Sequence, residues 1–253
     1  MAFDPQNLLE QSLMQAASDP AHRPQFYRDL ASADVFIIQE GPIESPGGAV
    51  LKQGQTVRIR HMESNGKNYI PVFSSLPRLQ AVLREEAAFL SMNAIELMKL
   101  TRGAEFILNP GSDYGKEFTK GEIASIVDGS IWQPTESYVA KKDEQVRIGQ
   151  PANYPTELAS ALARYFKTQK GVKRAFLAHF FNPQQDEKPH TLIAIEFSGD
   201  WNPIMAGAGM VAQGVKVPDP PVDFLAMTGN GGIEDYFRKD CKPFYERKRF
   251  GFF

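Results

Sequence analysis

The chain has 253 residues, of which 42% are hydrophobic and 23% are charged, and this predicts a folded protein of one large or two ordinary domains. A net charge of −2 excludes a generally basic surface and argues against nucleic acid as a partner. The single cysteine, Cys241, excludes an intrachain disulfide, and no apolar run is long enough to cross a membrane. We therefore expect a soluble, cytoplasmic protein.

The first half predicts two helices, followed by short strands that alternate with helices. Apolar spacing predicts a helix over 7–17, which Asp19-Pro20 ends, and a second helix that Pro24 opens. Strands are expected over 35–38, 56–61, 69–73, 88–92 and 105–108, with a hairpin turn at Asn65-Gly66. Helix N-caps are expected at Ser75, Asn93 and Thr119. The pattern indicates an α/β-type domain around a small mixed sheet.

A polar run over 133–145 predicts a linker between a first domain, 1–132, and a second domain, 146–253. In the second domain we expect a strand over 146–148, an amphipathic helix after Pro155, and a hairpin of strands over 173–181 and 190–197. A helix over 204–211 and a strand over 222–227 follow, and then a helix over 233–241 and an aromatic-basic tail. The order is typical of the split βαβ, ferredoxin-like arrangement, so the predicted fold class is α+β.

Five segments, spread over both halves, carry a resemblance to a known family. They are DPAHRPQFYRDL (19–30), IPVFSSLPRLQ (70–80), ILNPGSDYGKEFTKGEI (107–123), FKTQKGVKRAFLA (166–178) and PFYERK (243–248). With these segments the chain resembles the SseB family of bacteria, which is named after enhanced serine sensitivity protein B. The resemblance implies an SseB N-terminal domain followed by an SseB C-terminal domain. The family's name comes from a growth phenotype, and the resemblance brings no catalytic residues to this chain.

The turn after the predicted strand 105–108 is the first candidate site. Converging backbone amides, the start of the next helix and a lysine are features that can hold an anion or another ligand. The residues concerned are Gly111, Ser112, Gly115 and Lys116. The G-x-x-x-G-K spacing differs from a Walker loop, and the alternative interpretation is that the glycines only satisfy the geometry of the turn.

The second candidate site is a partner surface in the tail, made of Arg247, Lys248, Arg249, Phe250, Phe252 and Phe253. Interleaved aromatic and basic side chains can bind an acidic partner or nucleic acid, and exposed aromatics mark interfaces, such as that of a homodimer. The alternative is that the tail docks on its own domain through Phe244 and Tyr245.

No pattern in the sequence predicts a catalytic constellation, a metal site or a cofactor. The four histidines lack metal-ligand spacing, and Cys241 has two lysines nearby but no active-site loop around it. We therefore expect a non-enzymatic regulator or adaptor that binds a protein partner or a small metabolite, and the resemblance suggests a link to serine or sulfur metabolism. One alternative is an enzyme or accessory subunit of that metabolism that uses Cys241 or the 109–116 loop. The other is a weak nucleic-acid binder that uses the tail.

Overall fold

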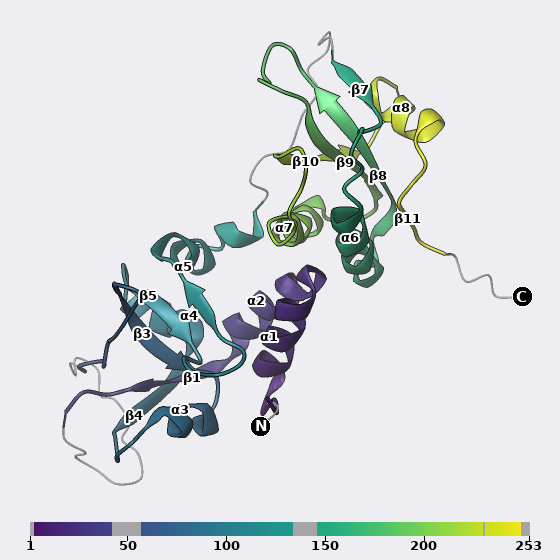
Figure 1. The fold of residues 1–253 in the computed structure, drawn as a ribbon. Helices are drawn as coiled ribbons and strands as arrows, with labels where there is room; N and C mark the ends of the chain where they lie inside the picture. Colours follow the sequence, from purple (N-terminus) through teal and green to yellow (C-terminus); the bar gives the residue numbers. More distant parts are fainter. Residues whose placement is uncertain (1–2, 42–56, 134–145, 230, 249–253) are drawn as a thin grey trace, which may run out of the picture. The chain divides into compact units, whose positions relative to one another are not determined.

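The computed structural model describes residues 3–41, 57–133, 146–229 and 231–248, and the chain divides into two compact units (Figure 1). The first unit comprises Met1–Ser18 and Gln25–Ile131, and the second comprises Asp19–Pro24 and Trp132–Phe253. The predicted linker lies outside the described residues, except for Gln133. Two mixed sheets with their helices confirm the α+β class.

The first unit is a six-stranded sheet with helices on both faces. Its strands have the order β4-β1-β3-β5-β6, with β2 paired to β3; β3 and β5 are parallel, and the other pairs are antiparallel. The elements are α1 (Leu8–Ser18), α2 (Arg23–Ser32), β1 (Asp34–Ile38), β2 (Met62–Ser64), β3 (Lys67–Phe73), α3 (Leu76–Val82), β4 (Phe89–Asn93), α4 (Ala94–Leu100), β5 (Glu105–Leu108), β6 (Lys116–Phe118) and α5 (Lys120–Val127).

Local chemistry places several of these elements where the sequence predicts them. Asn65 and Gly66 have φ angles of 52° and 73°, which let β2 turn into β3. The Asn93 side chain accepts hydrogen bonds from the backbone N–H groups of the first turn of α4, and the Thr119 hydroxyl accepts one at the start of α5. These turns and caps depend only on neighbouring residues.

The predicted strand over 56–61 is wrong. In its described part, one isolated bridge joins Ile59 to Gln39, beyond the end of β1, and the continuous ladder begins only where Met62 faces Tyr69 on β3. The alternation of apolar and charged residues over 57–61 is real, but among the described residues only the short segment 38–40 pairs with it, which is too little for a continuous ladder.

The helices are divided unequally between the two faces of the first sheet. Helices α1, α2, α4 and α5 cover one face, where their side chains form the larger core with strand residues such as Val35, Ile37 and Val72. On the other face the short helix α3 packs Leu79 against Ile38 and Phe73. The second face therefore carries much less helical cover than the first.

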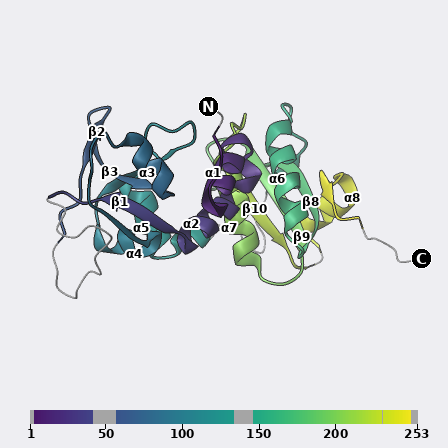
Figure 2. The ribbon, with the colours of Figure 1, turned by 90° about the horizontal axis from the view of Figure 1, so that it is seen from below.

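The second unit is a five-stranded sheet between helices. The strand order is β10-β9-β8-β11, with β7 also paired to β8. Figure 2 shows α6 and α7 on one face of this sheet and α8 on the other. Its elements are the 3-10 turn η1 (Pro20–His22), β7 (Arg147–Gly149), α6 (Thr156–Thr168), β8 (Val172–Phe181), β9 (His190–Phe197), α7 (Trp201–Ala212), β10 (Val222–Met227), α8 (Ile233–Asp240) and β11 (Tyr245–Glu246). The 3-10 turn η2 (Ser130–Trp132) spans the boundary, since the first unit ends at Ile131.

The ferredoxin-like arrangement predicted for this unit is wrong in its strand pairing, although the elements follow one another along the chain as expected. In a split βαβ unit, another strand separates the two strands that a helix connects. Here β7 pairs directly with β8, antiparallel, and β10 pairs directly with β9, parallel. The order of elements along a chain does not specify which strands become neighbours, because pairing depends on distant contacts.

The segment Asp19–Pro24 is part of the second unit, although the chain on either side of it belongs to the first. Ala21 is buried in the core that α6 and α7 share. The Asp19 carboxylate accepts a hydrogen bond from the Ala21 N–H at 3.0 Å and two more from the Arg164 guanidinium of α6. Asp19 therefore caps η1 and also anchors it to α6.

Candidate functional site

The predicted anion loop follows β5, and each of its glycines has a structural role. Gly111 has a φ angle of +77°, which favours glycine. A Cβ at Gly115 would lie 2.7 Å from the carbonyl oxygen of Leu108, so a side chain does not fit there. The Ser112 N–H donates to the Asn109 carbonyl at 3.2 Å and closes the turn. The geometry of the turn accounts for this part of the sequence.

Lys116 begins β6 and turns its charge toward its own unit. Its Nζ lies 3.0 Å from Glu122 Oε1 and 4.8 Å from the centre of the Phe118 ring. The same Glu122 oxygen accepts a hydrogen bond from the Tyr27 hydroxyl. An anion at this loop would have to compete with Glu122 for the lysine, so anion binding at 111–116 stays a prediction with no further support.

A buried polar network, which no sequence pattern predicts, lies at the carboxyl ends of β3 and β5. Asn109 Oδ1 accepts from the Ser74 N–H at 2.9 Å, and the hydroxyl groups of Ser74 and Ser75 each donate to Glu10 Oε1 at 2.7 Å. Ser75 was expected to cap α3 with its side chain, but its hydroxyl is directed to Glu10 instead. Every carboxylate oxygen of Glu10 has a donor, which marks this network as structural.

The described part of the tail docks on its own unit. The Tyr245 hydroxyl donates to the Phe166 carbonyl at 3.1 Å. The Arg247 guanidinium donates to the carbonyls of Phe166, Gln169 and Val172 at 2.6–3.0 Å, and so caps the end of α6. Lys248 is exposed. The other residues of the predicted partner surface, Arg249, Phe250, Phe252 and Phe253, lie outside the described residues.

Cys241 follows α8 and is buried, with 8% of its surface exposed. Its sulfur accepts a hydrogen bond from Gln150 Nε2 at 3.0 Å. Burial raises the pKa of the Cys241 thiol above its ordinary value. Lys239, one of the two lysines that could activate it, pairs with Asp235 instead, at 2.9 Å. A nucleophilic role for this thiol therefore gains no support from the structure.

Two histidines lie close to aspartate carboxylates at one end of the second sheet. His190 has 4% of its side chain exposed; its Nε2 lies 2.9 Å from Asp223 Oδ2 and its Nδ1 3.7 Å from Asp186 Oδ2. His179 Nε2 lies 3.5 Å from Asp219. Among the described residues, no three His, Cys, Asp or Glu side chains are placed to hold a metal ion.

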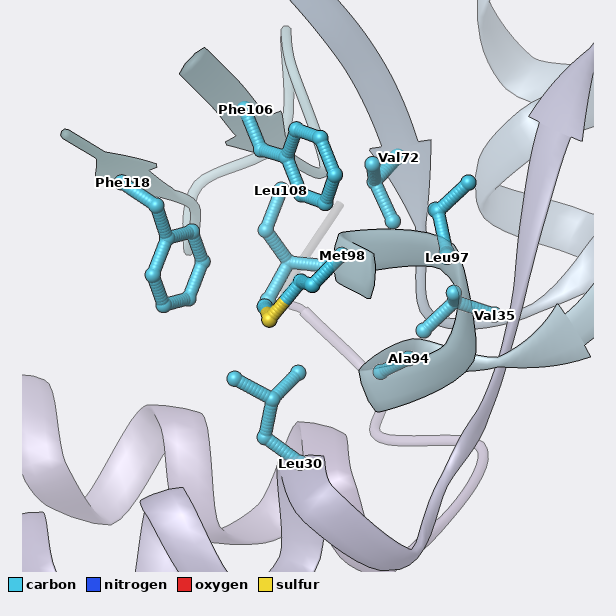
Figure 3. A pocket seen from close by; sticks show the side chains of 9 residues that line it. All are labelled: Leu30, Val35, Val72, Ala94, Leu97, Met98, Phe106, Leu108 and Phe118. Atoms are coloured by element: carbon cyan, nitrogen blue, oxygen red, sulfur yellow. The ribbon is translucent and has the colours of Figure 1, made fainter. Parts of the chain in front are cut away.

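A small cavity lies inside the first unit, between the sheet and its larger helical layer (Figure 3). Its volume is about 10 Å³, roughly the space of one water molecule, and its lining is apolar. A metabolite does not fit into such a void. The side chains around it are Leu30, Val35, Val72, Ala94, Leu97, Met98, Phe106, Leu108 and Phe118.

An apolar surface lies on the sparsely covered face of the first sheet. We call it the α3–β4 surface and define it as Phe36, Leu76, Leu83, Ala87 and Phe89. Phe89 begins the edge strand β4, is 44% exposed, and has its ring centre 6.0 Å from that of Phe36. Aromatic side chains such as phenylalanine are enriched at protein–protein interfaces.

The backbone of β4 is open along its outer side. Gln39 donates to the Ala88 carbonyl at 2.8 Å, and Ala94 donates to the Ala33 carbonyl at 3.0 Å. Because antiparallel ladders alternate, residues 88, 90, 92 and 94 direct their backbone groups to β1, and Phe89 and Ser91 direct theirs outward. In the part of the chain that the structure describes, no strand pairs with this outer side. Phe89 therefore combines an exposed ring with an unpaired backbone.

Family models identify both halves of the chain. The model of the SseB protein N-terminal domain matches residues 9–125, and that of the SseB protein C-terminal domain matches residues 140–247. The chain belongs to the SseB family, which confirms the resemblance seen in the sequence. It is similar to Protein SseB of Escherichia coli (strain K12) and to Protein SseB of Shigella flexneri, each 33% identical over 249 residues, which is 97% of this chain and 94% of the relative. No solved structure matches the chain significantly.

None of the described helices is both long enough and apolar enough to cross a membrane.

Proposed function

We propose that this SseB-family protein is an adaptor that binds a partner protein through the α3–β4 surface of its first unit. The observation that carries the proposal is Phe89, which is 44% exposed at the open edge of the sheet. Leu8 and Leu100 are more exposed, but each is a single aliphatic residue on a helix, and such residues are normal on protein surfaces.

The other candidate functions have less support. The described cavity is too small for a metabolite, the Cys241 thiol is buried, and Lys116 is paired with Glu122. The link to serine or sulfur metabolism, the non-enzymatic role, the homodimer and the cytoplasmic location stay predictions.

Site-specific photo-crosslinking in cells tests this proposal. A benzophenone amino acid is placed at Phe89 in one variant and at Leu100 in a matched control, since Leu100 is 73% exposed and lies on α4, outside the surface. We expect a discrete crosslinked partner from position 89 and none from position 100. Affinity capture should lose the same partner with Phe89→Asp and keep it with Leu100→Asp. Identical crosslinks from both positions, or none from position 89, would contradict the proposal.

A further inference from the structure

We infer that the α3–β4 surface takes an extended segment of the partner, which adds to the outer side of β4 as a further strand and carries cations at both ends. This inference rests on the proposed function and specifies the partner's chemistry. Three observations support it: the backbone of β4, the face beside it, and the charges at its ends.

The backbone of β4 lacks the features that usually protect an edge strand. Natural edges are protected by charged side chains, prolines, bulges or very short strands. The sequence of β4, Phe-Leu-Ser-Met-Asn, has no charge and no proline, and its register with β1 is regular over all five residues. At the opposite edge of the same sheet, β6 has only three residues and carries Lys116 and Glu117. The outward N–H and C=O groups of Phe89 and Ser91 are therefore suited to pair with an added strand.

The face beside β4 specifies one side of the incoming segment. Ile38 faces Phe89 and Phe36 faces Ser91 across β1 and β4, so these four side chains share the face that α3 covers only partly. A strand added next to Phe89 would place alternate side chains on this face. Apolar or aromatic residues at those positions would cover the exposed ring of Phe89.

The charges at the two ends of β4 specify the ends of the segment. Glu85 and Glu86 precede the strand, and Asp34 faces Asn93 at its far end; all three carboxylates are exposed. None of them forms an ion pair within the described ranges, and Arg84 directly precedes Glu85, so the three carboxylates and this arginine together carry a net negative charge. Lysine or arginine at both ends of the incoming segment would complement these carboxylates.

Binding of a synthetic peptide tests the inference. The probe KKFTVTKK has cations at both ends and alternating apolar residues in the middle, and EEFTVTEE is its charge-reversed control. By isothermal titration calorimetry with the full chain, we expect KKFTVTKK to bind and EEFTVTEE not to bind. The double variant Glu85→Gln/Glu86→Gln should weaken binding of KKFTVTKK at low salt and flatten its salt dependence. Absence of KKFTVTKK binding, or equal binding of both peptides, would overturn the inference.

A substitution at Ser91 separates strand addition from simple contact with side chains. The Ser91 N–H is directed away from β1, so Ser91→Pro removes the donor for an incoming strand and leaves the ladder with β1 in place. We expect at least tenfold weaker peptide binding for Ser91→Pro, and unchanged binding for Ser91→Thr, which keeps the N–H group. Equal peptide affinity of wild type and Ser91→Pro would overturn strand addition.

Hydrogen exchange in the wild type keeps the test decisive if Ser91→Pro does not fold. Saturation with KKFTVTKK should slow exchange of the Phe89 and Ser91 amides, and unchanged exchange would overturn the inference. Sedimentation velocity tests whether a second copy of this chain binds the outer side of β4 instead. A wild-type dimer that Ser91→Pro converts to monomer would assign the edge to that second copy and would also overturn the inference. If crosslinking from position 89 succeeds while the peptide tests fail, the adaptor function stands and strand addition falls.

Discussion

Arg78 Nη2 lies 3.0 Å from Glu10 Oε2, and the Glu10 side chain in this pair has no exposed surface. The pair joins α1 to α3, and hydrogen bonds from Ser74 and Ser75 supplement it. Burial by itself would raise the pKa of Glu10, but the Arg78 guanidinium, the Gln6 N–H and the two serine hydroxyls together hold it below its ordinary value. The folded first unit thus stabilises Glu10 in its charged form.

Replacement of Glu10 by alanine should destabilise the first unit strongly. Removal of one partner of a buried ion pair leaves the other charge uncompensated and costs about 3–5 kcal/mol. We expect the lower part of this range, because Arg78 retains 18% exposure and can partly rehydrate. Guanidinium unfolding measures the change. Glu96→Ala is the control, since Glu96 and Lys99 are 60% and 45% exposed, and its loss should stay below about 0.5 kcal/mol. Equal losses for both variants would contradict a special role of Glu10.

The same carboxylate predicts sensitivity to acid. Because the folded-state pKa of Glu10 is lowered, its stabilisation is fully present above the unfolded-state pKa of about 4.3 and is lost as the pH falls through the lower folded-state value. Unfolding free energies measured between pH 7 and pH 3 should therefore fall more steeply for wild type than for Glu10→Gln. Parallel curves for the two proteins would show that Glu10 does not contribute to the acid response.

Two glycines of α7 offer a matched test of helix packing. A Cβ on Gly207 would clash with the hydroxyl of Tyr165, a fully buried side chain of α6, whereas a Cβ on Gly209 would meet no atom within 4 Å. We expect Gly207→Ala to lower the unfolding free energy of the second unit by about 1–3 kcal/mol, as overpacking does. Gly209→Ala should be neutral or slightly stabilising, because alanine favours helix. Thermal unfolding of both variants distinguishes these outcomes, and equal effects would exclude close α6–α7 packing at Gly207.

His190 predicts a stability change in the opposite pH direction. The hydrogen bond to Asp223 raises the pKa of His190; burial opposes this, and Asp186 and the Lys188 carbonyl add to it. The stabilisation is fully present below the unfolded-state pKa of about 6.5 and is lost as the pH rises through the higher folded-state value. His179 and Asp219 lie at the same end of the sheet and stay unaltered in the test, so the variants are confined to His190 and its partner.

Thermal unfolding of the second unit at several pH values between 5.5 and 8.5 measures this effect. Asp223→Asn removes the negative partner and should flatten the slope, whereas His61→Asn, at an exposed position of the first unit, should leave it unchanged. A slope that persists in Asp223→Asn would assign the pH dependence to other groups.

The thiol of Cys241 should react slowly in the folded protein. Its pKa is raised and 8% of its surface is exposed, so little thiolate is present at neutral pH and little of it is reachable. We expect modification by Ellman's reagent at pH 7.5 to be much slower than that of free cysteine, and to become fast in guanidinium. A folded-state rate equal to or above that of free cysteine would revive the enzyme alternative.

Much of the local structure follows from the sequence, and most of the candidate surface does not. The Asn65-Gly66 turn, the caps at Asn93 and Thr119, and the amphipathic helix after Pro155 are all present. The exposure of Phe89 was not predicted, because a strand's sequence does not reveal whether it lies at an edge or in the middle of a sheet. The glycines of the prominent G-x-x-x-G-K turn, in contrast, are explained by the backbone geometry of the turn.

The sequence by itself determined the α+β class, the family, and the turns and caps, because each of these depends on composition or on residues a few positions apart. Tertiary structure alone decided the strand order of the second sheet, the place of Asp19–Pro24 in the second unit, and the pairing of Glu10 with Arg78, which is 68 positions away. It also decided that β4 is an edge. Such features depend on which distant segments the packed core brings together, and a local pattern does not encode that choice.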